Sequence, residues 1–231
     1  MKIIVAFAIC TGTWAQTGVD RPQLGKMLDA NGAVRTVYGI AASVMLGDVE
    51  MSGVISSACS KAFCLAKTET SIVSAMGSVD TPAGPAMFAF DGDSAFVWFP
   101  RSRQLAKWHD GVLDVLDSSI EGEVLSIRAS AGSLEFAVRR FKKDVWIVKL
   151  DGGGVGFLPH STGPVMLIPG GVVYAAKGEI AIRDVRLPLE EVTAFHQMSV
   201  NYLQVRAGGL DYSLRIDSGR ETLFQLPGVS Q

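Results

Sequence analysis

Three polar side chains of this chain stand where they could hold a ligand. Arg128 and Gln204 each lie four residues before a glycine, and Arg206 follows two residues after Gln204. A guanidinium or amide group in such a place can bind a carboxylate, a sulfate or a sugar hydroxyl through hydrogen bonds. We therefore treat Arg128, Gln204 and Arg206 as candidate ligand-binding residues. The alternative is that all three are ordinary polar positions on a solvated strand face.

An aromatic residue and a histidine form a second candidate contact. Trp108 and His109 stand at the end of a predicted strand, directly before a loop, and loops on a rigid scaffold often carry binding residues. Trp108 and His109 are therefore candidate ligand contacts at the rim of the fold. Packing in the core is the alternative for the tryptophans, and Trp146, within the apolar run VWIVKL, is expected to be buried.

Catalytic motifs are absent from the sequence, which contains no G-x-S-x-G, no H-E-x-x-H and no G-x-x-x-x-G-K-[ST] pattern. Glycoside hydrolysis needs a pair of carboxylates. The strands expected at the centre of the fold contain neither Asp nor Glu; they are residues 86–90, 124–128, 165–168 and 201–206. We predict no catalytic residue and no cofactor. A glycan-active hydrolase or lyase with a central site is the alternative function.

Two cysteines, Cys59 and Cys64, stand five residues apart and are a candidate disulfide. This spacing could cross a β-hairpin, and disulfides persist in exported proteins. The repeat described next places Cys59 in a turn and Cys64 on the following strand, an awkward geometry that leaves two free thiols as the alternative. The pair supplies too few ligands for a metal, and the three histidines are scattered along the chain, so no metal site is predicted.

A repeat of glycine, three residues and an aromatic organises the elements that would position these side chains. It occurs at Gly92–Phe96, Gly132–Phe136, Gly170–Tyr174 and Gly208–Tyr212, with the aromatics 40, 38 and 38 residues apart. A fifth copy, Cys59–Phe63, lacks the glycine and has its aromatic 33 residues before Phe96. Self-similarity at such a period marks a repeat architecture. Each glycine suits a tight hairpin turn, where φ is positive.

Each repeat contains about four short strands. In the fourth repeat they are residues 165–168, 172–176, 179–184 and 189–195. Repeated four-stranded sheets bury their faces against each other when they are arranged around an axis, so the chain resembles a β-propeller. The resemblance is one of architecture and period over nearly all of the chain. WD dipeptides and kelch-type glycine pairs at the proper spacing are absent, so no named propeller family is implied.

The sequence therefore predicts an all-β fold, a five-bladed β-propeller, because about five sheets of about 35–40 residues fill the chain. The last repeat has only three predicted strands, residues 201–206, 211–216 and 221–226. The resemblance implies that an N-terminal strand, residues 34–38, completes this blade and closes the ring, since an open edge would invite aggregation. The alternative architecture is a β-sandwich or barrel, which also has short strands at regular intervals.

The ends of the chain and its composition suggest where it works. Residues 1–15 combine a basic start, an apolar run and small residues, as a cleaved signal peptide does; a buried first strand is the alternative. That run is too short to span a bilayer, and we predict one propeller domain over residues 16–231, secreted or periplasmic. A net charge of −2 without a basic stripe argues against a nucleic-acid partner.

These observations lead to a function in outline only. We predict an exported, non-enzymatic binding or interaction module without a membrane span. Its partner would be an unidentified small molecule, a glycan or another protein.

Overall fold

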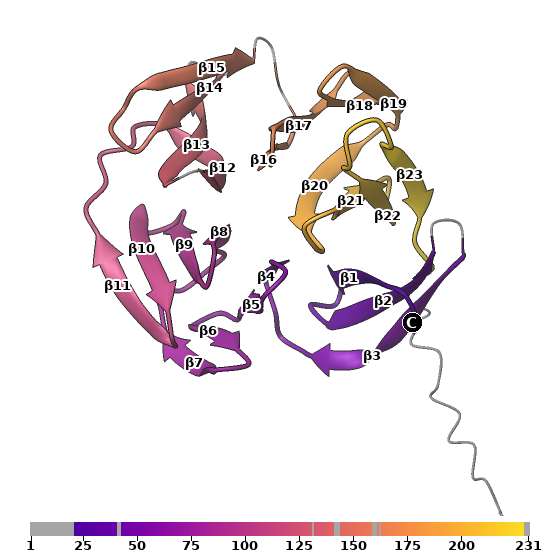
Figure 1. The fold of residues 1–231 in the computed structure, drawn as a ribbon, viewed down its shortest axis with the longest axis horizontal. Helices are drawn as coiled ribbons and strands as arrows, with labels where there is room; N and C mark the ends of the chain where they lie inside the picture. Colours follow the sequence, from indigo (N-terminus) through magenta and orange to yellow (C-terminus); the bar gives the residue numbers. More distant parts are fainter. Residues whose placement is uncertain are drawn as a thin grey trace, which may run out of the picture.

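The computed structural model of this protein describes residues 21–228, apart from 41–42, 131, 141–143, 159–160, 162 and the side chain of Ser130. The described residues form six antiparallel β-sheets, and Figure 1 shows them arranged as the blades of a ring. The β-propeller expectation is confirmed, and the sandwich or barrel is not what forms. Among the described residues no helix has the length and apolarity needed to cross a membrane.

The blades are numbered 1 to 6 in chain order. Blade 1 has three described strands, namely β1 (Gln23–Leu28), β2 (Val34–Ile40) and β3 (Ser43–Met51). Blades 2 and 3 have four each, namely β4 (Ser56–Cys59), β5 (Cys64–Lys67), β6 (Ser71–Ser74), β7 (Gly77–Asp80), β8 (Met87–Asp91), β9 (Ser94–Phe99), β10 (Gln104–His109) and β11 (Val112–Leu116).

Blades 4, 5 and 6 also have four strands each. They are β12 (Glu123–Ser130), β13 (Ser133–Arg140), β14 (Asp144–Lys149), β15 (Gly154–Leu158), β16 (Val165–Ile168), β17 (Gly171–Ala176), β18 (Glu179–Ile182), β19 (Val185–Pro188), β20 (Val192–Gln197), β21 (Tyr202–Ala207), β22 (Leu210–Arg215) and β23 (Thr222–Gln225). In every blade the first strand lies nearest the axis and later strands lie progressively farther out (Figure 1).

Alternating apolar residues explain why these sheets stack around the axis. Successive side chains of a strand point to opposite faces. In β13, Phe136 and Val138 pack toward blade 3, whereas Ala137 packs toward blade 5. Each of the six seams between blades has its own apolar cluster in this way. The core is therefore divided among the seams.

The prediction of five blades is wrong, because the fourth copy of the repeat occupies a different place in its blade. Gly92, Gly132 and Gly170 lie between the first and second strands of blades 3, 4 and 5, whereas Gly208 lies between the second and third strands of blade 6. Tyr212 is consequently on a third strand, while Phe96, Phe136 and Tyr174 are on second strands. The equal spacing arose because a short blade 5 is followed by a shifted repeat.

The predicted closure of the ring is also wrong. Residues 189–195 were assigned to the end of the fourth repeat, but residues 192–197 form β20, the innermost strand of blade 6. Blade 6 thereby obtains all four strands from the C-terminal part of the chain. Residues 34–40 form β2, the middle strand of blade 1. The ring closes by side-by-side contact of β1 with β20 and β21 rather than by a shared sheet.

Candidate functional site

A cavity of about 720 Å³ occupies the centre of the ring. It is lined by the innermost strands of blades 2 to 6, which are β4, β8, β12, β16 and β20, and by residues just before them. No described residue of blade 1 belongs to this lining. The inner strand of blade 1, β1, lies farther from the axis than the other inner strands (Figure 1). The inner strands of its two neighbours, β4 and β20, contact each other in front of it.

The cavity wall is mostly apolar. Its apolar residues include Phe88, Met166, Leu167, Ala194 and Phe195. The wall also contains serines, but two of them already hold neighbouring blades together. The hydroxyl oxygen of Ser56 accepts a hydrogen bond from the Ala86 N–H at 3.0 Å, and that of Ser126 accepts one from the Leu167 N–H at 3.0 Å.

One carboxylate belongs to the described lining, that of Glu123. Its side chain is 64% exposed and accepts a hydrogen bond from the Arg139 guanidinium at 3.0 Å. Arg139 also donates to the carbonyl oxygen of Gly163, in the segment that leads into blade 5, at 3.1 Å. The described wall therefore lacks the two facing carboxylates that glycoside hydrolysis requires.

His196 is the histidine of the described lining, and it projects from β20, the inner strand of blade 6. Burial lowers the pKa of His196 to about 4; the positive charge of Arg206 lowers it further, while Asp211 opposes the shift. The ring is therefore neutral at pH 7 and offers one N–H donor and one nitrogen acceptor. Within the described part of the chain, no residue hydrogen-bonds to this imidazole, which leaves it available to a ligand.

Arg128, a predicted ligand contact, instead joins blade 4 to blade 5. Its Nε donates to the carboxylate of Glu135 on β13 at 3.0 Å, and its Nη2 contacts the same oxygen. Its Nη1 donates to the carbonyl oxygens of Ile168 and Gly171, the latter at 2.8 Å. The guanidinium is thus occupied by protein groups at the seam.

Gln204 and Arg206, also predicted ligand contacts, join blade 6 to blade 1. They lie on the second strand, β21, and not on an inner strand as expected. The buried Gln204 amide accepts from the Leu28 N–H at 2.9 Å and donates to the Leu28 carbonyl at 2.8 Å and to Asp211 at 2.8 Å. Arg206 donates to the same carbonyl at 2.9 Å and to Asp211 at 3.0 Å.

Trp108 and His109 do not reach the central cavity. Trp108 is only 1% exposed and packs against Phe63, with ring centroids 4.9 Å apart. His109 lies at the exposed end of β10 and is 2.7 Å from the carboxylate of Asp114 on β11. The expectation that Trp146 is buried is wrong: it is 38% exposed on an outer strand. There it packs beside Phe157, with ring centroids 4.7 Å apart.

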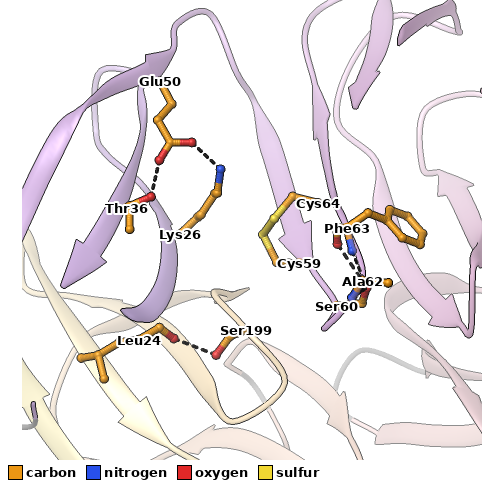
Figure 2. Close-up of a disulfide and its surroundings, with 10 residues drawn as sticks. All are labelled: Leu24, Lys26, Thr36, Glu50, Cys59, Ser60, Ala62, Phe63, Cys64 and Ser199. Atoms are coloured by element: carbon orange, nitrogen blue, oxygen red, sulfur yellow. Dashed lines mark hydrogen bonds and ion pairs between the residues drawn. A yellow bond between two sulfur atoms is a disulfide. The ribbon is translucent and has the colours of Figure 1, made fainter. Parts of the chain in front are cut away.

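Cys59 and Cys64 form a disulfide across the β4–β5 hairpin (Figure 2). The turn between them is ordered by Ser60, whose hydroxyl accepts from the N–H groups of Ala62 and Phe63 at 3.1 Å each. This turn places the two cysteines opposite each other in the hairpin. The geometric objection raised from the sequence therefore does not apply.

The disulfide borders a second cavity, of about 220 Å³, between blades 1 and 2. The facing wall of blade 1 holds Lys26, which pairs with Glu50, and Thr36 hydrogen-bonds the same carboxylate (Figure 2). Burial raises the pKa of Glu50, but the hydrogen bonds from Lys26 and Thr36 outweigh it and hold the pKa below its usual value. These charges satisfy each other, so the central cavity offers the better ligand site.

Sequence reasoning missed the importance of His196, because residues 189–195 were assigned to an outer strand of the preceding blade. The signal that could have found it is the run Val192–Gln197, which is long enough for an inner strand. Gln204, on the neighbouring strand, was chosen instead because it lies four residues before Gly208. The structure pairs these two residues directly across β20 and β21.

Comparison with known proteins identifies no family: neither a family model nor a curated protein matches this chain. Several solved structures match. U3-55K is 12% identical, with a TM-score of 0.49, over 91% of this chain and 82% of that one. The Myceliophteria thermophila Cps50 (Swd1) β-propeller domain is 12% identical, with a TM-score of 0.47, over 89% and 83%.

A third match is Kluyveromyces lactis Hsv2, which is 14% identical, with a TM-score of 0.46, over 75% of this chain. This chain spans 63% of the length of Hsv2, which is less than two thirds. At these identities the similarity concerns the fold alone. The function has to be argued from the residues of this chain.

Proposed function

We propose that this protein is an exported, non-enzymatic binding module that takes a small-molecule ligand into its central cavity. The observation that carries the proposal is the cavity itself, bounded by the inner strands of five blades. Its volume of about 720 Å³ lies within the usual range for small-molecule sites, about 300–1,000 Å³. Rigid strands on every side suit a site that holds a ligand without rearrangement.

Two further observations favour binding in the cavity over the alternatives. Arg128, Gln204 and Arg206, which were predicted to bind a ligand, hydrogen-bond to protein groups at the seams between blades. The hydrolase alternative requires a second carboxylate beside Glu123, and the described lining does not supply one. Binding therefore accounts for the site better than glycan hydrolysis does.

The disulfide supports the exported part of the proposal. Disulfides persist in oxidising compartments and are rare in reducing ones, and Cys59–Cys64 is one. The predicted signal peptide, residues 1–15, lies outside the described residues. Secretion and residence in a periplasm fit this disulfide equally.

A cavity-filling variant tests the proposal. Ala194 lines the cavity, so Ala194→Trp should fill part of it and reduce the affinity of any cavity ligand at least about tenfold, since steric exclusion removes its contacts. Binding would be measured by ligand-observed NMR with a panel of small aromatic, aliphatic and sugar compounds. Ala176→Trp, at an exposed strand end, is the matched control and should bind as the parent does.

Two results would contradict this proposal. One is a compound that binds equally to the parent and to Ala194→Trp, which would place its site elsewhere. The other is a panel in which nothing binds the correctly folded parent protein.

A further inference from the structure

We propose that the ligand of the central cavity is an uncharged, mostly apolar molecule whose single hydrogen-bonding group meets His196. This inference rests on the proposed function and adds the chemical class of the ligand. It follows from three properties of the site: the polar groups already used, the character of the remaining wall, and the state of the imidazole.

The first property is that three side-chain hydroxyls of the wall already hydrogen-bond to the protein itself. Ser56 and Ser126 accept from backbone N–H groups of the next blade. The hydroxyl of Thr193 donates to the carbonyl oxygen of Arg206 at 3.2 Å. A sugar needs partners for many hydroxyl groups, and a buried hydroxyl without a partner costs free energy. These three hydroxyls are therefore less available to the hydroxyl groups of a glycan.

The second property is the apolar character of the remaining wall. Most residues of the lining are apolar, and they include Phe88, Phe195, Met87 and Met166, which also pack in the apolar clusters between blades. Methionine side chains adapt to irregular apolar shapes and pack well against aromatic rings. Burial of apolar ligand surface against them contributes about 25 cal/mol per Å². An aromatic or aliphatic ligand gains most from this wall.

The third property is that the described lining holds no charged side chain other than Glu123 and Arg139. The charged pair of the described lining, Glu123 and Arg139, belongs to the start of β12 and the end of β13, where blade 4 receives the chain from blade 3. Its two members neutralise each other. His196 is held neutral by burial, which lowers its pKa. A charged ligand group would lose its hydration without gaining a counter-charge.

His196 then provides the polar contact that orients the ligand. Its neutral ring carries one donor and one acceptor, and no described residue occupies either. A hydroxyl, carbonyl or amide of the ligand can pair with it. One such hydrogen bond contributes about 1 kcal/mol, which corresponds to about fivefold in affinity.

Three probes with the same ring system separate these contributions: 2-methylnaphthalene, 2-naphthol and naphthalene-2-sulfonate. We expect 2-naphthol to bind about fivefold more tightly than 2-methylnaphthalene, because its hydroxyl meets His196. We expect the sulfonate to bind at least about tenfold more weakly than 2-naphthol, because its charge must be desolvated. Methyl glucoside, the glycan probe, should show no binding. Affinities would be measured at pH 7 by ligand-observed NMR.

Variants assign each effect to its residue. His196→Phe should make 2-naphthol and 2-methylnaphthalene bind equally, whereas His196→Gln keeps a donor and an acceptor and should restore part of the preference for the hydroxyl. The preference for 2-naphthol is the ratio of two affinities within one variant, so a general loss of packing does not mimic its disappearance. Ala194→Trp should weaken both uncharged probes, and Ala176→Trp neither.

The outcomes distinguish this inference from the proposed function. Binding of the sulfonate or of methyl glucoside at least as tight as that of 2-naphthol, blocked by Ala194→Trp, would overturn the ligand class and keep the cavity as the site. A hydroxyl preference that persists in His196→Phe would overturn the role of His196. Probe binding that Ala194→Trp leaves unchanged would overturn the proposed function together with this inference.

Discussion

At the scale of residues, the account depends on which polar groups are already occupied. Gln204 illustrates the point, because its amide pairs with both backbone groups of Leu28, as a neighbouring strand would. His196 lies directly opposite Gln204 in the sheet and has no such partner among the described residues. Two polar residues that are paired across β20 and β21 thus differ in role: Gln204 holds two blades together, and His196 lines the central cavity.

The depressed pKa of His196 predicts a pH dependence of stability. Its value falls from 6.5 to about 4 on folding, so between these values the unfolded chain binds a proton that the folded protein does not. The free energy of unfolding should therefore be constant above about pH 6.5 and decrease as the pH falls toward 4. The full shift corresponds to about 3 kcal/mol, and we expect about 2 kcal/mol because the ring is only half-buried.

Urea unfolding at a series of pH values measures this effect. Acidic residues titrate in the same range, so the comparison is between the parent and His196→Gln, which removes the titrating group. The parent should lose more stability than His196→Gln between pH 6.5 and 4.5. Parallel pH profiles for the two proteins would show that His196 is not held neutral in the fold.

At the scale of elements, partly buried arginine side chains hydrogen-bond across the seams between neighbouring blades. Arg128 with Glu135, and Arg206 with Asp211, each direct a guanidinium at the carbonyl of the last residue of a neighbouring inner strand, Ile168 in one case and Leu28 in the other. The seam between blades 6 and 1 has further bonds. The Lys26 N–H donates to the Met198 carbonyl at 3.0 Å, and the Ser199 hydroxyl donates to the Leu24 carbonyl at 2.7 Å (Figure 2).

Gly25 allows β1 to approach blade 6 this closely. A Cβ at this position would overlap the backbone of Met198, so Gly25→Ala should push β1 away and weaken the closure of the ring. We expect a loss of about 2–4 kcal/mol in the free energy of unfolding, because the overlap with Met198 adds to the cost of backbone strain, which alone is about 1–3 kcal/mol. Gly77→Ala is the matched control, since Gly77 has a similar positive φ, 132° against 143°, and an added Cβ there meets nothing within 4 Å.

Urea unfolding of both variants checks this prediction, and hydrogen exchange at the amides of residues 24–28 shows whether the loss is local to the seam. Equal losses in Gly25→Ala and Gly77→Ala would mean that close approach to Met198 is not what Gly25 provides.

The sequence was sufficient for the propeller class of fold and for many strands of blades 3 to 6, because alternation and glycine turns are local signals; β3 and the strands of blade 2 were not predicted. The predicted strand 112–116 coincides with β11, and 165–168 with β16. The number of blades depends on how strands group into sheets, which local signals do not encode. First strands begin at residues 23, 56, 87, 123, 165 and 192, so the true period varies with loop length. For that reason the sequence did not reveal that Gly208 lies one strand later in its blade than Gly92, Gly132 and Gly170 do in theirs.

The candidate site was less accessible from the sequence than the fold. Arg128 and Arg206 were chosen because cations often bind ligands, yet a guanidinium serves equally well to bind backbone carbonyls across a seam. Whether a polar group is free depends on partners far away in the sequence, such as Leu28 for Gln204. The cavity wall comes from five separate blades, so its apolar character emerged only from the assembled ring.

At the scale of the whole molecule, the ring has six blades, but the described lining of its central cavity comes from five of them. Blade 1 stands behind β4 and β20 and is fixed to blade 6 by the bonds around Leu28 and Met198. The arrangement leaves the inner strands of blades 2 to 6 to form the wall. The proposed function makes this wall the place where the molecule meets its ligand, while the outer strands carry exposed apolar side chains such as Trp146 and Phe157.

The most direct test of the account is a crystal structure of the protein soaked with 2-naphthol. The account predicts density for the ring system inside the central cavity, with the naphthol oxygen within about 3.2 Å of an imidazole nitrogen of His196. Density on the outer rim of blade 4, stacked on Trp146 and Phe157, with the central cavity containing only solvent, would contradict it.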